Sequence, residues 1–400
     1  MTVDLKIYAE NLEQEAMDQI KTLVAQPAFD GAKVRIMPDA HAGAGCVIGF
    51  TANLGDKVVP NLVGVDIGCG MLTADVGHGR IDLPGLDKAC HAVPHGFDVW
   101  DGRRERFDLE ELRCFRQLHD TGRMERSIGT LGGGNHFVEV DVDDSGRRYV
   151  VIHSGSRNLG LQVAKHYQSV AVDLRSGKGE LFDRKRELIE AYKAQGRHSE
   201  IQGALVRLES EYGASEPDVP RDLCWLDGTW AEDYLHDVAV CQRFAMRNRE
   251  RMLTEIVAMT GLDVQSSFHT VHNYIGDDGI IRKGAISARE GETVLIPFNM
   301  RDGSVIARGK GNEDWNNSAP HGAGRIMSRT KARATLDVGE FESQMDGVYS
   351  TTVCEGTLDE APGAYKPADA IMGLLGPTVD VVERLKPIYN FKAVNEGRRR

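Results

Sequence analysis

The chain has 400 residues, of which 41% are hydrophobic and 27% are charged, a balance ordinary for a soluble globular protein. Its net charge of -12 argues against indiscriminate binding of nucleic acid through a basic surface, although metal ions or local basic patches can still hold phosphates. The seven cysteines have no regular spacing typical of a disulfide framework, no apolar stretch approaches the ~20 residues that span a bilayer, and the acidic N-terminus does not resemble a signal peptide. We therefore expect a cytoplasmic protein without a membrane segment, and we expect a monomer because no feature predicts an obligate assembly.

In chain order, the first predicted element is an amphipathic helix over residues 11–25, where apolar side chains recur at helical spacing. Over residues 32–76, short apolar runs broken by Gly, Pro and Asp predict short buried strands and tight turns. A further helix is predicted around residues 109–119. Over residues 138–153, apolar runs on both sides of an Asp-Asp-Ser-Gly sequence predict a β-hairpin.

The segment 162–258 differs in character, because it is rich in Glu, Arg, Lys, Ala and Leu. It predicts several helices around a polar break at residues 212–222, and we interpret it as a helical insertion. The last predicted helix covers residues 368–385. Because glycine-rich pieces lie on both sides of the helical segment, we expect residues 1–400 to form one intertwined α+β domain with mixed or antiparallel sheets.

Glycine is unusually frequent, with 44 residues in the chain, and much of the excess is gathered in short clusters. Clustered glycine lets the backbone turn tightly or come close to a ligand. The clusters cover residues 43–49, 64–70, 129–134, 303–311 and 322–324.

Four short segments place metal-ligating side chains in glycine-rich or turn-like surroundings. Their candidate ligands are Asp66, Cys69, His136, His153 and His272. A carboxylate, a thiolate and three imidazoles would suffice for one crowded metal site or for two adjacent ones, in which the thiolate could bridge both ions. Taken alone, each histidine is more typical of a turn or packing residue, and Cys69 of a small buried hydrophobic residue. Only the combination favours a metal site.

A histidine at a glycine-flanked turn, His321, precedes a segment that predicts a helix over residues 326–333. Arg325, Arg329 and Arg333 recur every four residues and would share a face. A nucleophile at the start of such a helix would gain from amide dipoles that favour an incoming phosphate, whereas a solvated basic helix is the alternative interpretation. Just upstream, the small, polar and basic residues over 296–312 suit a nucleotide cradle, although an ordinary surface loop has the same composition.

Several of these segments, in this order, resemble the RtcB family of RNA ligases. The matching motifs are Pro38-Asp-Ala-His-Ala-Gly-Ala-Gly45, Val63-Gly-Val-Asp-Ile-Gly-Cys-Gly-Met71, Gly129-Thr-Leu-Gly-Gly-Gly-Asn-His136, His153-Ser-Gly-Ser-Arg157, Arg282-Lys-Gly-Ala-Ile-Ser-Ala288, His321-Gly-Ala-Gly-Arg325 and Ala361-Pro-Gly-Ala-Tyr-Lys366. They run over nearly the whole chain, and residues 162–258 resemble the family least.

The resemblance implies an enzyme that joins RNA ends carrying a 2′,3′-cyclic phosphate or 3′-phosphate to ends carrying a 5′-hydroxyl, in RNA repair or tRNA splicing. It implies that a histidine attacks GTP, becomes covalently linked to GMP and passes the guanylate to the RNA 3′-phosphate. The implied cofactors are GTP and two Mn²⁺ ions. RNA is the implied partner, and the family resemblance also leaves room for an accessory activating protein.

Carried over to matching positions, His321 would be the guanylylated nucleophile, and Cys69 would be shared by two metal ions. The implied metal ligands are Asp66, Cys69, His136, His153 and His272. The implied nucleotide-binding residues are Asn135, His136, Phe137, Val138, Glu139, His272, Asn273, Pro297, Phe298, Asn299, Met300, Ser304, His321, Gly322, Ala323, Gly324, Tyr365 and Lys392. The carboxylate of Glu139 could accept hydrogen bonds from N1–H and from the exocyclic amine of guanine, which adenine cannot offer.

Two departures from the family concern this pocket. Asn299 stands where many members have Ser, and the chain continues to Arg400, past the lysine near which the family commonly ends. Mixed His, Cys and Asp ligands favour zinc over manganese by intrinsic affinity, so we expect zinc to compete.

Arginines flanking the site are predicted RNA contacts, namely Arg157, Arg325, Arg329 and Arg333, whereas Arg103, Arg104 and Arg106 are interpreted as solvated surface. Two other functions stay open from the residues alone. One is a binuclear metallo-phosphoesterase that hydrolyses cyclic phosphate ends, and the other is a non-catalytic protein that binds RNA ends.

Overall fold

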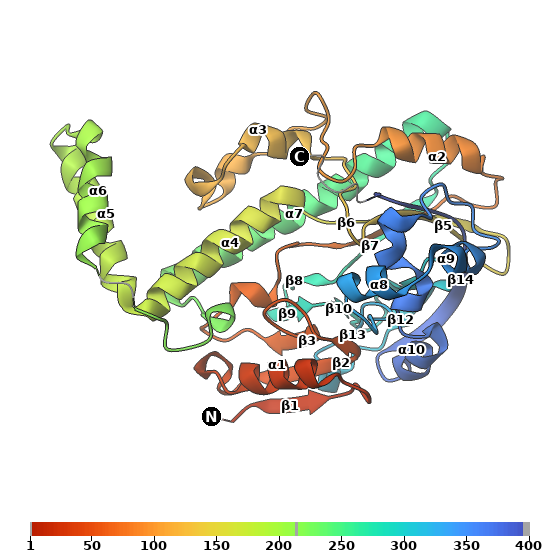
Figure 1. Ribbon diagram of the computed structural model, residues 1–400, viewed down its shortest axis with the longest axis horizontal. Helices are drawn as coiled ribbons and strands as arrows, with labels where there is room; N and C mark the ends of the chain where they lie inside the picture. The colour runs from red at the N-terminus through yellow and green to blue at the C-terminus, as the bar shows by residue number, and fades with distance from the viewer. Residues whose placement is uncertain (1, 213–214, 395–400) are drawn as a thin grey trace.

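A computed structural model describes residues 2–212 and 215–394 of the chain (Figure 1). The largest sheet has seven strands in the order β11-β12-β14-β5-β6-β4-β7, and each neighbouring pair is antiparallel. Its strands are β4 (Gly70–Asp75), β5 (Phe137–Val142), β6 (Arg148–Ser154), β7 (Ser266–Val271), β11 (Thr293–Asn299), β12 (Gly303–Gly309) and β14 (Val379–Lys392). The hairpin predicted over residues 138–153 is confirmed as β5 and β6.

A second sheet has five strands in the order β1-β2-β3-β9-β8, in which β1 and β2 are parallel and the other pairs are antiparallel. Its strands are β1 (Asp4–Ile7), β2 (Lys33–His41), β3 (Ile48–Asn53), β8 (Asn273–Ile275) and β9 (Ile280–Lys283). A short pair joins β10 (Ala285–Ser287) to β13 (Ser318–Pro320). The expectation of an α+β fold with mixed and antiparallel sheets is therefore confirmed, as are the short strands predicted between residues 32 and 76.

The helices lie around these sheets. They are α1 (Gln14–Val24), α2 (Leu83–Ala92), α3 (Thr121–Arg126), α4 (Arg157–Asp173), α5 (Gly179–Ala194), α6 (Ile201–Glu211), α7 (Gly228–Thr260), α8 (Arg329–Thr335), α9 (Val338–Gln344) and α10 (Ala368–Leu375). The first predicted helix is confirmed as α1, whose buried residues Ala16, Ile20 and Leu23 lie on one face. No helix within residues 2–212 and 215–394 is long and apolar enough to cross a membrane.

The segment 162–258 is helical as predicted, but its helices play different structural roles. α5 and α6 form a hairpin that projects from the body of the protein (Figure 1). In contrast, α4 and α7 pack together and bury Tyr167, Tyr234 and Phe244 in the largest hydrophobic cluster. Residues 213–214, within the polar break predicted at 212–222, lie outside the described residues.

The helix predicted over residues 109–119 is wrong. Two 3₁₀ turns, Leu109–Glu111 and Phe115–Gln117, occupy this segment. The carboxylate of Asp237 accepts hydrogen bonds from the backbone N–H groups of Arg113 and Cys114 at 2.8 and 3.0 Å. Because Asp237 belongs to α7, a tertiary contact takes the amides that a continuous helix would have used.

Two other helix predictions are also wrong in their bounds. α10 ends at Leu375, and residues from Val379 onward form β14, not the rest of a helix to residue 385. The Gly376-Pro377 pair ends the helix, and the following residues pair with β12. α8 begins at Arg329, because the Ser328 side chain caps it by accepting from the Lys331 amide, so His321 is not at a helix start.

Candidate metal and nucleotide site

Strand pairing brings three distant segments to one end of the large sheet. Gly70, the first residue of β4, pairs with Ser154 of β6 on one side and with Val271 of β7 on the other. Cys69, His153 and His272 each lie next to one of these paired residues in sequence. This register therefore places a thiol and two imidazoles at the same end of the sheet.

The five predicted metal-ligating side chains meet there in two groups that share Cys69. One group is Asp66, Cys69 and His136, and the other is Cys69, His153 and His272. The Cys69 Sγ lies 3.4 Å from Nε2 of His136 and 3.3 Å from Nε2 of His153. The Nε2 atoms of His153 and His272 are 3.4 Å apart, and Nε2 of His136 is 2.9 Å from Oδ2 of Asp66.

The second nitrogen of two of these imidazoles is held by a backbone carbonyl. Nδ1 of His136 contacts the Leu131 oxygen at 2.9 Å, and Nδ1 of His153 contacts the Asn135 oxygen at 3.0 Å. Since a carbonyl only accepts, each Nδ1 must carry the proton, and the lone pair of each Nε2 faces Cys69. Lone pairs that converge in this way fit a bound cation.

Burial shifts the titration of this cluster in a direction that also fits a metal site. Desolvation, together with the neighbouring Asp66, raises the pKa of Cys69 well above its ordinary value. Desolvation lowers the pKa of His153 and His272 well below the usual range, which keeps both imidazoles neutral. Neutral imidazole is the ligand form, and a coordinated cation would deprotonate the thiol.

Two buried residues of α7 support the cluster from behind. Arg249 donates to the carbonyls of Gly68 and Ser154, both at 2.8 Å. Asn248 accepts from the amides of Gly129 and Thr130 and donates to the Gly155 carbonyl. Neither residue was predicted from the sequence, because both lie in the helical segment and match no glycine-rich motif. Their polar character at positions on the buried face of a helix was the one available signal.

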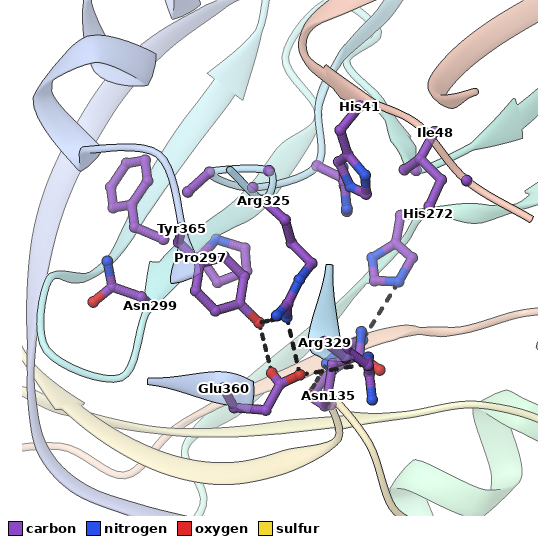
Figure 2. Close-up of a pocket in the computed structure, with 18 of the residues that line it drawn as sticks. His41, Ile48, Asn135, His272, Pro297, Asn299, Arg325, Arg329, Glu360 and Tyr365 are labelled. Carbon is purple, nitrogen blue, oxygen red and sulfur yellow. Dashed lines mark hydrogen bonds and ion pairs between the residues drawn. The ribbon is translucent and has the colours of Figure 1, made fainter. Parts of the chain in front are cut away.

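A cavity of about 600 Å³ opens beside the cluster. It is lined by fifteen of the predicted nucleotide-binding residues, some of which are labelled in Figure 2. These are Asn135, Phe137, Glu139, His272, Asn273, Pro297, Phe298, Asn299, Met300, His321, Gly322, Ala323, Gly324, Tyr365 and Lys392.

Some predicted nucleotide-binding residues lie outside the cavity wall, and some residues of the wall were not predicted. His136, Val138 and Ser304 belong to the set but lie outside the wall, whereas His41, Glu360 and Asn390 line the wall and were not predicted. His41 stood within a family motif, so its position was a usable signal. Lys392 lies in the wall, and residues 395–400 of the tail that follows lie outside the described residues.

His321 lies in this wall, directly after β13, and its side chain is 21% exposed. Its Nδ1 is 2.7 Å from Oδ2 of Asp39, at ion-pair distance but without hydrogen-bond alignment. Asp39 is fully buried, and its Oδ2 also accepts from the backbone amides of His321 and Gly322 at 3.0 and 3.3 Å. The contact leaves Nε2 as the ring nitrogen free to act on a ligand.

Gly324 explains why the turn after His321 needs glycine. Its φ is +70°, and a Cβ at this position would lie 2.2 Å from the Asp39 carbonyl oxygen. A side chain here would therefore push the turn away from the strand that carries Asp39. His41 lines the same cavity as His321, and burial lowers the pKa of His41 to about 4, so that its imidazole is neutral.

A pair of buried carboxylates, Glu139 and Asp141, lies on β5. Glu139 reaches the cavity, and its Oε2 accepts from Asn390 at 2.6 Å. The hydroxyl of Ser304 donates to Oδ2 of Asp141 at 2.6 Å. Burial, followed by the charge of Asp141, raises the pKa of Glu139 well above its ordinary value. Ser304 therefore contacts Asp141, the neighbour of Glu139, and does not line the cavity.

The three arginines predicted to share a helix face converge on two carboxylates instead. Arg325 and Arg329 pair with Glu360 at 3.2 and 3.4 Å, and Arg333 pairs with Asp359 at 3.0 Å. Arg325 precedes α8 and so does not lie on that helix.

Of the other arginines considered from the sequence, Arg157 and Arg103 have partners of their own. The Arg157 guanidinium donates to the Thr130 hydroxyl and the Gly96 carbonyl. Arg103, Arg104 and Arg106 are exposed, and Arg103 lies 3.4 Å from Glu125.

Comparison with known proteins gives a match along the chain. The model of the family described as "tRNA-splicing ligase RtcB" matches residues 19–121 and 113–393. The RNA-splicing ligase RtcB of Escherichia coli K12 is 30% identical, and the match covers 95% of each chain. The tRNA-splicing ligase RtcB of Nanoarchaeum equitans is 26% identical, with 98% of this chain and 96% of that protein covered.

Proposed function

The chain belongs to the RtcB family, and from this premise we propose that it is a GTP- and manganese-dependent RNA ligase. It joins a 2′,3′-cyclic phosphate or 3′-phosphate end to a 5′-hydroxyl end, in RNA repair or tRNA splicing. Residues 1–400 act as one ligase domain, and the reaction passes through GMP linked to His321.

The observation that carries this proposal is the pairing of His321 with Asp39 beside the metal cluster. The rings of His321 and His272 are 5.1 Å apart and approach edge to face, so the candidate nucleophile lies next to a candidate ligand (Figure 2 labels His272). Asp39 holds the Nδ1 side of the ring, which turns Nε2 toward the cavity. A neutral imidazole nitrogen held in this way is a capable nucleophile.

From a 3′-phosphate end, the proposed reaction has three steps. Nε2 of His321 forms a bond to the α-phosphorus of GTP while the bond from that phosphorus to the bridging oxygen breaks, and pyrophosphate leaves. An oxygen of the RNA 3′-phosphate then displaces the imidazole from phosphorus and takes the guanylate. The 5′-hydroxyl oxygen of the second RNA end then bonds to the activated 3′-phosphorus and its proton passes to solvent, while the bond from that phosphorus to the guanylate oxygen breaks and GMP leaves. A cyclic phosphate end must first be hydrolysed to the 3′-phosphate.

Asp66, Cys69, His136, His153 and His272 would hold the two manganese ions. When bound, such ions neutralise phosphate charge and stabilise the leaving pyrophosphate. Because nitrogen and sulfur ligands favour zinc by intrinsic affinity, zinc is proposed to compete for the same positions and to inhibit.

Guanine would be selected by Glu139, the carboxylate that reaches the cavity from β5. An ionised carboxylate accepts two parallel hydrogen bonds from N1–H and the 2-amino group of guanine, whereas adenine presents an acceptor at N1. Lys392 and Tyr365 line the same cavity and supply a cation and an aromatic ring for the rest of the nucleotide.

A second function uses the same metal ligands. A binuclear phosphoesterase would hydrolyse cyclic phosphate ends and would need neither His321 nor a guanine pocket. His321 and a cavity that Glu139 lines lie beside the cluster, which supports the ligase.

The test is covalent labelling of the full-length protein with α-labelled GTP and manganese. The expected result is an acid-labile label on the native protein that His321→Ala abolishes. His78→Ala, which changes an exposed histidine outside the cavity, is the matched control and should label normally. A folded, manganese-loaded protein that takes no label but opens cyclic phosphate ends would overturn the ligase proposal in favour of the phosphoesterase. Zinc that supports full labelling would overturn the proposed inhibition.

A further inference from the structure

The side chain of Glu360 contacts four other residues of the cavity wall. Its carboxylate lies 2.6 Å from the Tyr365 hydroxyl and 3.4 Å from Nζ of Lys392. It also lies 3.2 Å from Arg325 and 3.4 Å from Arg329. Figure 2 shows Glu360 between Tyr365, Arg325 and Arg329, with dashed lines marking these contacts.

The four partners come from separate parts of the chain. Lys392 ends β14, Arg329 begins α8, Arg325 lies between β13 and α8, and Tyr365 directly follows the 3₁₀ turn Pro362–Ala364. All four line the cavity together with Glu360. One carboxylate therefore connects elements whose mutual placement defines the shape of this wall.

A buried carboxylate would repel a nucleotide phosphate, so its presence needs a physical reason. Burial alone would raise the pKa of Glu360, but Lys392, Arg329 and Arg325 outweigh it and lower the pKa below the ordinary value. Glu360 is thus held as an anion among cations. Lys392 is itself buried, and its Nζ lies 5.0 Å from the centre of the Phe137 ring. Without Glu360, that ammonium would lose its ion-pair partner in this wall and could turn away.

We propose that Glu360 is a positioning residue of the nucleotide pocket, which holds Lys392 and Tyr365 at the cavity wall and so sets the affinity for GTP. It does not touch the reacting phosphorus or His321. This inference rests on the proposed function, because it takes GTP as the occupant of the cavity. It assigns a distinct role to a residue that belongs to none of the metal-ligand or nucleotide motifs.

The adjacent residue supplies a matched control. Asp359 is as deeply buried as Glu360, and its carboxylate pairs with Arg333 at 3.0 Å and with Arg329 at 3.7 Å. Unlike Glu360, Asp359 is not part of the cavity wall. Removing either charge should lower the melting temperature, because Arg325 loses its ion-pair partner without Glu360 and Arg333 loses its partner without Asp359. Only removal of the Glu360 charge should change the affinity for GTP.

The experiment compares Glu360→Gln with Asp359→Asn in the full-length protein, measuring equilibrium GTP binding and the KM and kcat of His321 labelling. Glu360→Gln should raise Kd and KM for GTP about tenfold, the effect of losing one positioned charge-assisted contact, with kcat unchanged. Asp359→Asn should leave both unchanged at a similar loss in melting temperature. In a Lys392→Met background, Glu360→Gln should add less than it does alone, since part of its effect acts through Lys392.

The outcomes separate this inference from the function on which it rests. Native protein that binds no GTP would overturn both. Native protein that binds GTP, with Glu360→Gln binding equally well or with effects additive to Lys392→Met, would overturn the positioning role alone. If Glu360→Gln does not fold, Glu360→Asp keeps the charge but shortens its reach. That variant should also weaken GTP binding, and unchanged binding would contradict the proposal.

Discussion

Oδ2 of Asp39 lies 2.7 Å from Nδ1 of His321, although the two residues are 282 positions apart in the chain. Asp39 belongs to β2, and His321 follows β13. The carboxylate also accepts hydrogen bonds from two backbone amides of the turn that carries the histidine. It therefore fixes both the ring and the backbone of the candidate nucleophile.

We expect Asp39→Asn to slow His321 labelling by GTP roughly 10²-fold, because the amide keeps the shape but loses the charge that orients the imidazole. The rate of single-turnover labelling measures this effect. GTP binding should be unaffected, since Asp39 is fully buried behind the histidine. Native labelling rates in a folded Asp39→Asn protein would show that the pairing only stabilises the turn.

Cys69→Ala should weaken manganese binding, because this thiol is common to both candidate metal groups. We expect manganese affinity to fall by at least about tenfold, since mutating a residue that only hydrogen-bonds to a metal ligand already costs that much. Metal analysis after dialysis against limiting manganese gives the stoichiometry. Cys241→Ala is the control, because Cys241 is equally buried but lies in α7 outside both groups. Equal metal content in the two variants would exclude Cys69 as a ligand.

Glu139→Gln should reduce the preference for GTP over ATP, because an amide offers one acceptor where the carboxylate offers two. We expect the ratio of labelling efficiencies to fall by roughly tenfold, the value of one charge-assisted hydrogen bond. Competition between the two nucleotides at constant manganese measures the ratio. An unchanged ratio would place guanine selection on another residue of the wall.

GTP affinity should rise with pH until it passes the pKa of Glu139. Burial, followed by Asp141, raises that pKa well above the ordinary value, while Lys392 and the Asn390 amide oppose the rise. Below the raised pKa, Glu139 is protonated and must release a proton to accept two hydrogen bonds from guanine, so Kd falls by up to about tenfold per pH unit. Above it, Kd is constant.

Asp141→Asn removes the neighbouring negative charge, so the rise in affinity should move to lower pH. Glu139→Gln should abolish the component of the pH dependence that belongs to the carboxyl. Calorimetric titration with GTP over a series of pH values distinguishes the three proteins. A pH profile identical in native protein and Glu139→Gln would assign the titration to another group.

The sequence alone identified the local features of this protein. Glycine clusters around Cys69, His136 and His321 indicated turns that bring the backbone close to a ligand, and an Asp-Asp-Ser-Gly turn between apolar runs indicated the β5–β6 hairpin. These features depend on residues near one another in the chain, so residue type and spacing suffice to predict them. The family resemblance then ordered the motifs into one site.

Tertiary structure decided what lies between those motifs. Asp39, Arg249 and Glu360 support the site from β2, α7 and the 3₁₀ turn Glu355–Glu360. Most of their partners are distant in sequence, so no local pattern predicts these contacts. The same reason accounts for the wrong helix over residues 109–119, where Asp237 accepts hydrogen bonds from two backbone amides. It also accounts for the short α10, because the residues that follow it pair with β12 as strand β14. Local periodicity records the preferences of a segment, whereas burial and strand pairing with the rest of the chain determine whether the segment follows them.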